Sequence, residues 1–161
     1  MLAGYGVEWF EEPLKPDALD DFVALRRNAP LPIAGGEVLT RRQSFLPWPT
    51  AGAFDVVQPD VTKVGGISEE RKIGWMAQAH GIRFIPHGWN TALGLAADVQ
   101  LASAFADTDL VEYITGSAYV DKLTVEGFQL DGDGMLAIPD QPGIGVTLDP
   151  DAVERFSGVR L

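Results

Sequence analysis

The chain has 161 residues, of which 46% are hydrophobic, a formal net charge of −11 and no cysteine. Its length and apolar content predict a globular protein with its own core, and its acidic balance argues against nucleic acid bound through a broad basic surface. The lack of cysteine excludes disulfides and thiolate metal sites, so any metal is held by oxygen or imidazole, as suits Mg²⁺ or Mn²⁺. Because no apolar run reaches the roughly 18 residues of a membrane helix and the start MLAGYGVEWF lacks a signal-peptide pattern, we expect a cytoplasmic protein without a membrane partner.

Strand-like and helix-like segments alternate along the chain. The expected strands are GVEWFEEP (6–13), PLPIAGGE (30–37), FDVVQPD (54–60), RFIPH (83–87) and LVEYI (110–114). The expected helices are DALDDFVALRRNA (17–29), TRRQSFLPWPTAGA (40–53, bent or shortened by its prolines), ISEERKIGWMAQAHG (67–81) and NTALGLAADVQLASAFA (90–106). Four strand–helix units followed by a fifth strand predict an α/β fold with parallel strands and right-handed crossovers.

Each expected strand ends at or near an ionisable side chain. These side chains follow one another at nearly regular intervals: Glu11, Glu37, Asp60, His87 and Glu112. In parallel sheets and barrels the carboxyl ends of the strands form the ligand-binding face, so we expect the five groups to converge on one pocket. The alternative is that they are unrelated surface groups.

Five motifs resemble the mandelate racemase branch of the enolase superfamily. In chain order they are WFEEP (9–13), GGE (35–37), QPDVTKVGG (58–66), IPHG (85–88) and PDQPGIGV (139–146). The resemblance covers essentially the whole chain. It implies that residues 1–115 form the C-terminal part of a (β/α) TIM-type barrel, about strands four to eight. It implies that residues 116–161 form a tail that packs on a capping domain, and that the chain is the C-terminal part of a longer or split protein.

The resemblance also implies a set of site residues. Family members hold Mg²⁺, for which Mn²⁺ is a substitute, through three carboxylates. Glu11 and Glu37 match the second and third of these ligands. Asp60 and His87 match a paired Asp–His base, and Glu112 matches a glutamate that binds the substrate carboxylate. An imidazole fixed by a carboxylate is suited to removing the proton α to a carboxylate near neutral pH.

Other candidates have alternative interpretations. Lys63 lies just past a strand end, where it either touches the substrate or is structural. Trp89 and Asn90 follow the expected base and are candidates for substrate binding, although Asn90 is also suited to capping the next helix. Glu12 is expected to make structural hydrogen bonds because it alternates away from Glu11. His80 is expected to stabilise the end of its helix.

The favoured function of the complete protein is acid-sugar dehydration, a lyase reaction through an enediolate. In that reaction His87 removes the carbon-2 proton or delivers a proton while the 3-hydroxyl leaves. A racemase or epimerase of a 2-hydroxy acid would use the same pair, and a noncatalytic fragment is the alternative of another class. The expected partners are a small-molecule acid sugar or 2-hydroxy acid and, because an open barrel exposes edge strands and apolar helix faces, further copies of the same chain in a homo-oligomer.

Overall fold

Four short strands form a parallel sheet at the centre of the fold. The computed structural model describes residues 2–157. The strands are β1 (Phe10–Glu11), β2 (Ile33–Gly35), β3 (Val56–Val57) and β4 (Arg83–Phe84). They pair in chain order, and every neighbouring pair is parallel. The predicted alternation of strands and helices is therefore confirmed, because parallel neighbours require a crossover connection.

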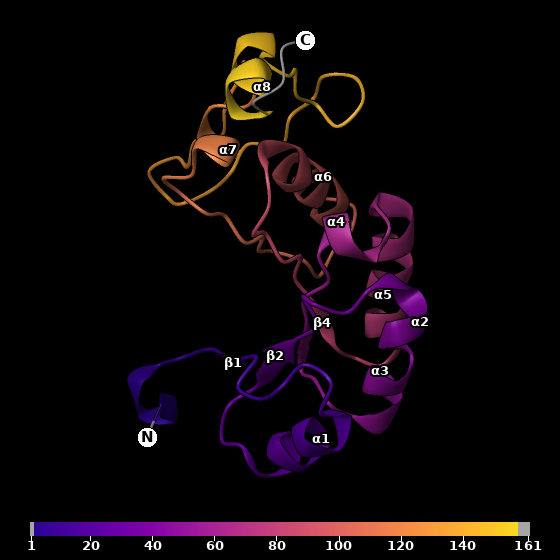
Figure 1. Cartoon of the computed structure of the whole chain (residues 1–161). Coiled ribbons are helices and arrows are strands. Elements are labelled where there is room, and N and C mark those ends of the chain that lie inside the picture. Colours follow the sequence, from indigo (N-terminus) through magenta and orange to yellow (C-terminus); the bar gives the residue numbers. More distant parts are fainter. Residues whose placement is uncertain (1, 158–161) are drawn as a thin grey trace.

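Helices connect the strands and cover one side of the sheet. Figure 1 shows α2, α3 and α5 on the same side of the strands, with the opposite side of the sheet left open. The elements outside the sheet are η1 (Leu2–Tyr5), α1 (Leu19–Asn28), α2 (Arg41–Phe45), α3 (Pro47–Ala51), α4 (Val61–Val64), α5 (Ile67–Ala79), α6 (Ala92–Ala102), α7 (Ala118–Asp121) and α8 (Pro150–Ser157). The carboxyl ends of these parallel strands share one edge of the sheet, which is where a ligand would meet the strand-end residues.

The helix expected over residues 40–53 is divided into α2 and α3. The break falls at Leu46, immediately before Pro47. A proline lacks the N–H that would continue the helical hydrogen bonding and fits best in the first turn of a new helix. The expectation that this helix is bent or shortened is confirmed.

The prediction of a fifth strand at residues 110–114 is wrong, because the described part of the chain forms no strand there. The Glu112 N–H still points to the Pro86 carbonyl, but at 3.4 Å. The neighbouring donor, the Gly88 N–H, bonds to the Glu112 carboxylate at 2.8 Å. A side chain therefore takes a donor that a regular parallel ladder would give to a backbone carbonyl, and the ladder stops.

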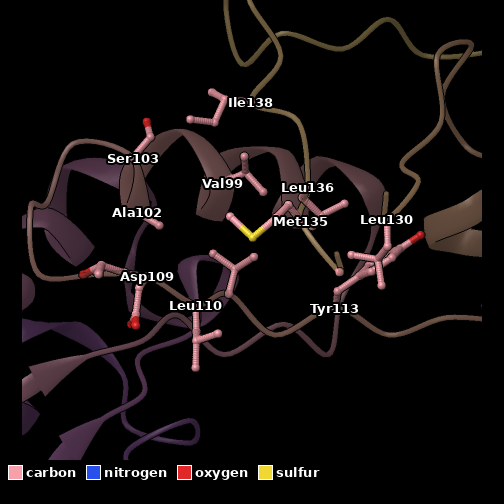
Figure 2. A pocket seen from close by; sticks show the side chains of 13 residues that line it. Val99, Ala102, Ser103, Asp109, Leu110, Tyr113, Leu130, Met135, Leu136 and Ile138 are labelled. Atoms are coloured by element: carbon pink, nitrogen blue, oxygen red, sulfur yellow. The ribbon is translucent and has the colours of Figure 1, made fainter. Parts of the chain in front are cut away.

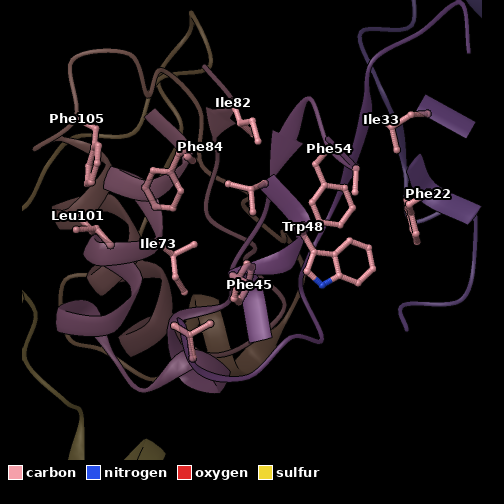
Figure 3. Packing of buried hydrophobic residues seen from close by; sticks show 14 residues of the cluster. Phe22, Ile33, Phe45, Trp48, Phe54, Ile73, Ile82, Phe84, Leu101 and Phe105 are labelled. Carbon is pink, nitrogen blue, oxygen red and sulfur yellow. The ribbon is translucent and has the colours of Figure 1, made fainter. Parts of the chain in front are cut away.

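Aromatic side chains build the main core between the sheet and the outer helices. The Trp48 and Phe54 rings stack with centroids 4.8 Å apart, and Phe22 meets both rings edge-on. Figure 3 shows this group together with Phe45 and Ile73, all buried. Residues of the strands, such as Ile33 and Val57, belong to this core. The core therefore holds in place the strands at whose ends the site residues lie.

The tail shares a second core with α6. Val120 and Phe128 of the tail pack with Leu95 and Val99 of the helix. The segment LDGDGML at residues 130–136, a hairpin-like stretch, closes through a bridge between Leu130 and Leu136. Residues 116–157 thus rest on the barrel portion, while the packing of 116–161 against a capping domain stays a prediction and residues 158–161 lie outside the described residues.

A cavity of about 200 Å³ separates α6 from the tail. Figure 2 shows Val99 and Ala102 of the helix facing Leu110 and Met135 across it. Its lining is mostly apolar and includes none of the residues expected in the catalytic site. We therefore assign it to the packing of the tail. Among residues 2–157, no helix combines the length and apolarity needed to cross a membrane.

Candidate active site

His87 and Asp60 form a buried pair at two neighbouring strand ends. The His87 Nδ1 atom lies 3.0 Å from the Asp60 Oδ2 atom. Backbone pairing sets this distance, because the His87 N–H donates to the carbonyl of Pro59 at 3.0 Å. The two side chains are 4% and 0% exposed. The structure therefore brings together the two residues that the sequence predicts as a base and its carboxylate partner.

Asp60 has the surroundings of an ionised carboxylate. Its Oδ1 atom accepts hydrogen bonds from the Thr62 N–H at 2.8 Å and the Thr62 hydroxyl at 2.5 Å, and so caps α4. Lys63 Nζ lies 3.6 Å from its Oδ2 atom. Burial alone would raise the pKa of Asp60, but the hydrogen bonds from His87 and Thr62 outweigh burial and lower the pKa to about 2. A permanent negative charge therefore stands behind His87.

The other ring nitrogen of His87 faces two more of the predicted residues. Its Nε2 atom lies 3.2 Å from Glu37 Oε2 and 3.7 Å from Glu112 Oε2. Burial would lower the pKa of His87, but the hydrogen bond to Asp60 and the charges of Glu112 and Glu37 outweigh it and raise the pKa above the ordinary 6.5. An imidazole held in this way accepts a proton readily near neutral pH.

The end of β1 presents Glu11 in a fixed orientation. Its Oε2 atom accepts hydrogen bonds from Gln58 Nε2 at 2.8 Å and from Trp9 Nε1 at 3.1 Å. Glu12 turns away, as predicted, and accepts the Gly36 N–H at 3.1 Å. Two donors on one oxygen of Glu11 leave its other oxygen available to a ligand.

Gln58 is a site residue that the sequence reasoning missed. It is 3% exposed, and its Oε1 atom has no hydrogen-bond partner within residues 2–157. The signal was present in the two-residue period of a strand, which puts Gln58 on the same face as Asp60. Gln58 links the Glu11 end of the site to the His87 end, because its strand carries Asp60 as well.

Glu11 and Glu37 have the right chemistry for part of a magnesium site. Both supply carboxylate oxygens, the ligands that Mg²⁺ prefers, from the ends of neighbouring strands. In the described part of the chain, however, no group of three acidic or histidine side chains has an arrangement that would hold a metal ion. The donors therefore fit Mg²⁺ in kind and provide only part of its coordination shell.

The remaining candidates are placed differently from one another. Lys63 contacts Asp60, whereas Trp89 is 74% exposed. Asn90 does not cap α6, whose N-cap is Thr91, so that alternative is wrong. Within the described residues, both amide atoms of Asn90 are buried without a partner. His80 accounts for the end of α5, as predicted, through a 2.9 Å contact with the Met76 carbonyl.

The chain belongs to the enolase C-terminal domain-like family, whose model matches residues 1–152. It is 36% identical to D-galactarolactone cycloisomerase from Agrobacterium fabrum, over 96% of this chain and 43% of that protein. It is 34% identical to arabinonate dehydratase from Saccharolobus solfataricus, over 96% of this chain and 41% of that protein. The chain thus spans about two-fifths of the length of these relatives.

Solved structures agree with these matches. A mandelate racemase/muconate lactonizing enzyme from Sulfitobacter sp superposes with a TM-score of 0.88 at 33% identity, over 96% of this chain and 38% of the other. The resemblance to the mandelate racemase branch is confirmed. So is the predicted fold class: the chain corresponds to the C-terminal part of the enolase-superfamily barrel.

Proposed function

We propose that this chain carries the acid–base half of a metal-dependent acid-sugar dehydratase. The observation that supports this proposal most directly is the buried His87–Asp60 pair, in which the second ring nitrogen of His87 contacts Glu37 and Glu112. The named relatives include a dehydratase of arabinonate and a cycloisomerase of D-galactarolactone. Such a pair is suited to a substrate with a weakly acidic C–H bond next to a carboxylate, because the imidazole can remove that proton.

His87 acts as the base in this proposal. Its Nε2 atom takes the proton from carbon 2 of the substrate, and the charge of Asp60 stabilises the imidazolium that forms. The same nitrogen then returns a proton to the 3-hydroxyl, which leaves as water. Because Asp60 is bonded to Nδ1, the Nε2 atom is the ring position left for substrate.

Glu112 and the metal ligands are proposed to stabilise the negative charge that develops on the substrate when its carbon-2 proton is removed. Glu112 is fixed by the Gly88 N–H and lies beside His87, where it is proposed to bind the substrate carboxylate through a hydrogen bond. Glu11 and Glu37 would hold Mg²⁺, or Mn²⁺ in its place. When bound, the cation offsets the second negative charge on the substrate, a contribution of several kcal/mol.

Three further residues are proposed to contact the substrate. Lys63 lies beside Asp60, Trp89 offers an exposed aromatic side chain two residues after the base, and Asn90 has an unpartnered amide in the described structure. A polyhydroxylated acid needs both hydrogen-bonding groups and a flat apolar surface. These side chains supply both on the segments that carry the pair.

Cycloisomerisation is a second candidate. It is favoured by the relative with 36% identity, D-galactarolactone cycloisomerase. Racemisation or epimerisation of a 2-hydroxy acid would use the same base, and a noncatalytic role of the chain on its own is the remaining alternative. The location in the cytoplasm and the assembly into a homo-oligomer stay predictions.

Product analysis separates these candidates. The purified chain is incubated with Mg²⁺ and a panel of aldonic and aldaric acids and their lactones in D₂O, followed by NMR. Dehydration predicts a 2-keto-3-deoxy acid formed with loss of water. A rearranged ring without loss of water would indicate the cycloisomerase, and deuterium at carbon 2 of an otherwise unchanged skeleton would indicate the racemase or epimerase. No exchange and no product across the panel would contradict a catalytic role for the chain alone.

A further inference from the structure

Two acidic side chains are buried at the contact between α5 and α6. Glu70, on α5, is 0% exposed, and Asp98, on α6, is 1% exposed. Within residues 2–157, none of their four carboxylate oxygens has a hydrogen-bond partner. Buried ionised carboxylates are normally paired or hydrogen-bonded, because removing such a charge from water without compensation costs several kcal/mol.

The charged groups that act on this pair are themselves negative. Glu70 experiences the charges of Asp98 and of Asp60, which caps the neighbouring helix α4. Asp98 experiences the charges of Asp60 and of Glu112 on the segment that follows α6. The amide of Asn90 lies near enough to Asp98 to favour its charged form, but it does not reach hydrogen-bond geometry with the carboxylate and carries no positive charge. These surroundings therefore disfavour two further negative charges.

Four cations on α5 and the neighbouring elements contact other carboxylates, and Arg71 of α5 lies over the Trp75 ring. Lys63 of α4 contacts Asp60, while Arg42 of α2 and Lys72 of α5 contact Glu69. In the same way, Arg83 of β4 bonds to Asp109. On α7, which also packs against α6, Asp121 acts on Tyr113. No cation in the described structure forms an ion pair with Glu70 or Asp98, so apart from the Asn90 amide near Asp98 a proton is the remaining source of a hydrogen-bond donor.

We propose that Glu70 and Asp98 hold at least one proton between them at neutral pH and act as a positioning pair behind Asp60. A protonated carboxyl supplies the missing donor and removes a negative charge from the helix contact. Burial, followed by the neighbouring carboxylates, raises the pKa of both side chains, which agrees with this assignment.

With the Glu70–Asp98 pair protonated, Asp60 is the buried carboxylate that carries the negative charge. Asp60 receives three hydrogen bonds, two from Thr62 and one from His87, whereas Glu70 and Asp98 receive none within the described residues. If Glu70 and Asp98 were ionised, their charges would raise the pKa of Asp60 and weaken its interaction with the protonated ring of His87. The catalytic consequence rests on the proposed function, but the protonation of the pair does not.

Carboxyl ¹³C NMR of the purified, uniformly ¹³C-labelled chain tests the inference without substrate or metal. Glu70→Gln and Asp98→Asn assign the two side-chain resonances. At pH 7 we expect at least one of them at its protonated position, shifting only in the alkaline range, while the Asp60 carboxyl carbon remains at its ionised position. If both resonances shift near pH 4, the ordinary range of carboxyl groups, the proposal is wrong.

Stability as a function of pH provides a second readout. A carboxyl whose folded pKa is raised stabilises the fold below its ordinary pKa, and this contribution is lost as pH rises through the folded pKa. The free energy of unfolding of the parent should therefore fall between about pH 6 and pH 9. The double variant Glu70→Gln/Asp98→Asn should have a shallower slope, of which the contribution of His87 remains, and the control Glu69→Gln should keep the slope of the parent. An unchanged slope in the double variant would overturn the proposal.

Discussion

The ring of His87 lies between two kinds of carboxylate: Asp60 binds its Nδ1 atom at 3.0 Å, and Glu37 lies 3.2 Å from its Nε2 atom. The two carboxylates come from the ends of different strands. Asp60 is closed to solvent, whereas the side chain of Glu37 is 29% exposed. The ring therefore has a fixed inner side and an open reactive side, and this asymmetry is the basis of the predictions that follow.

Asp60→Asn should lower the pKa of His87. The amide keeps the shape of the side chain but loses the charge, so burial, which lowers the pKa, is opposed less strongly. Proton and ¹⁵N NMR of the histidine rings across a pH series measures the effect. Asp21→Asn, which removes the same charge from an exposed position on α1, is the control. An unchanged His87 titration in Asp60→Asn would show that the pair does not tune the ring.

The contribution of His87 to stability should depend on pH. Since its folded pKa is raised above 6.5, that contribution is fully present below pH 6.5 and is lost as pH rises through the folded pKa. The difference in free energy of unfolding between the parent and His87→Gln should thus be larger at about pH 5.5 than at about pH 8.5. Urea unfolding measures it, with His80→Gln as the control. A difference that grows with pH would contradict the raised pKa.

Mn²⁺ should bind next to Glu11 and Glu37. Paramagnetic relaxation detects even weak binding, so substoichiometric Mn²⁺ should broaden the Trp9 indole and Gly36 amide NMR signals, which belong to groups bonded to Glu11 and Glu12. The indole of Trp75 is the internal control, because Trp75 is an exposed residue of α5 whose ring contacts Arg71 rather than a carboxylate of the site.

The broadening by Mn²⁺ should weaken in Glu37→Gln, which removes a ligand. In Gln58→Met the affinity for Mn²⁺ should fall roughly tenfold or more, because Gln58 orients Glu11. Equal broadening of the Trp9 and Trp75 signals would mean that the carboxylates do not form a metal site.

Gly88→Ala should destabilise the fold by about 1–3 kcal/mol. A Cβ atom at Gly88 would run into the carbonyl oxygen of Glu112, so the segment that carries this residue would have to move. Gly132→Ala is the matched control, because a Cβ atom there meets nothing within 4 Å. Denaturant unfolding of both variants measures the difference. Equal stabilities would contradict the close approach of the two segments.

Much of the fold follows from sequence periodicity, because β-branched runs alternate with amphipathic runs and a parallel sheet needs that order. The convergence of Asp60, His87, Glu37 and Glu112 follows from their places at strand ends. The loss of the fifth strand was beyond such reasoning, since it depends on the Glu112 side chain taking the Gly88 N–H. Local patterns describe backbone preferences, not competition for a single donor.

The buried acids were also beyond the sequence pattern. Glu70 lies in the polar run SEERK, which by composition is typical of a solvent-exposed helix face, yet it is fully buried. Asp98 lies in an apolar helix, where a single acid gives no hint of its partner. Their pairing depends on how α5 and α6 pack together, which only the three-dimensional structure contains.

The most direct test of the central claim is the dependence of substrate proton exchange on His87. The purified chain is incubated in D₂O with Mg²⁺ and an acid sugar on which it acts, and the loss of the carbon-2 proton signal is followed by NMR for the parent, His87→Asn and His80→Asn. We predict that His87→Asn loses exchange by at least two orders of magnitude, as expected on removal of a general base, while His80→Asn keeps the parent rate. Exchange at the parent rate in His87→Asn would contradict the account.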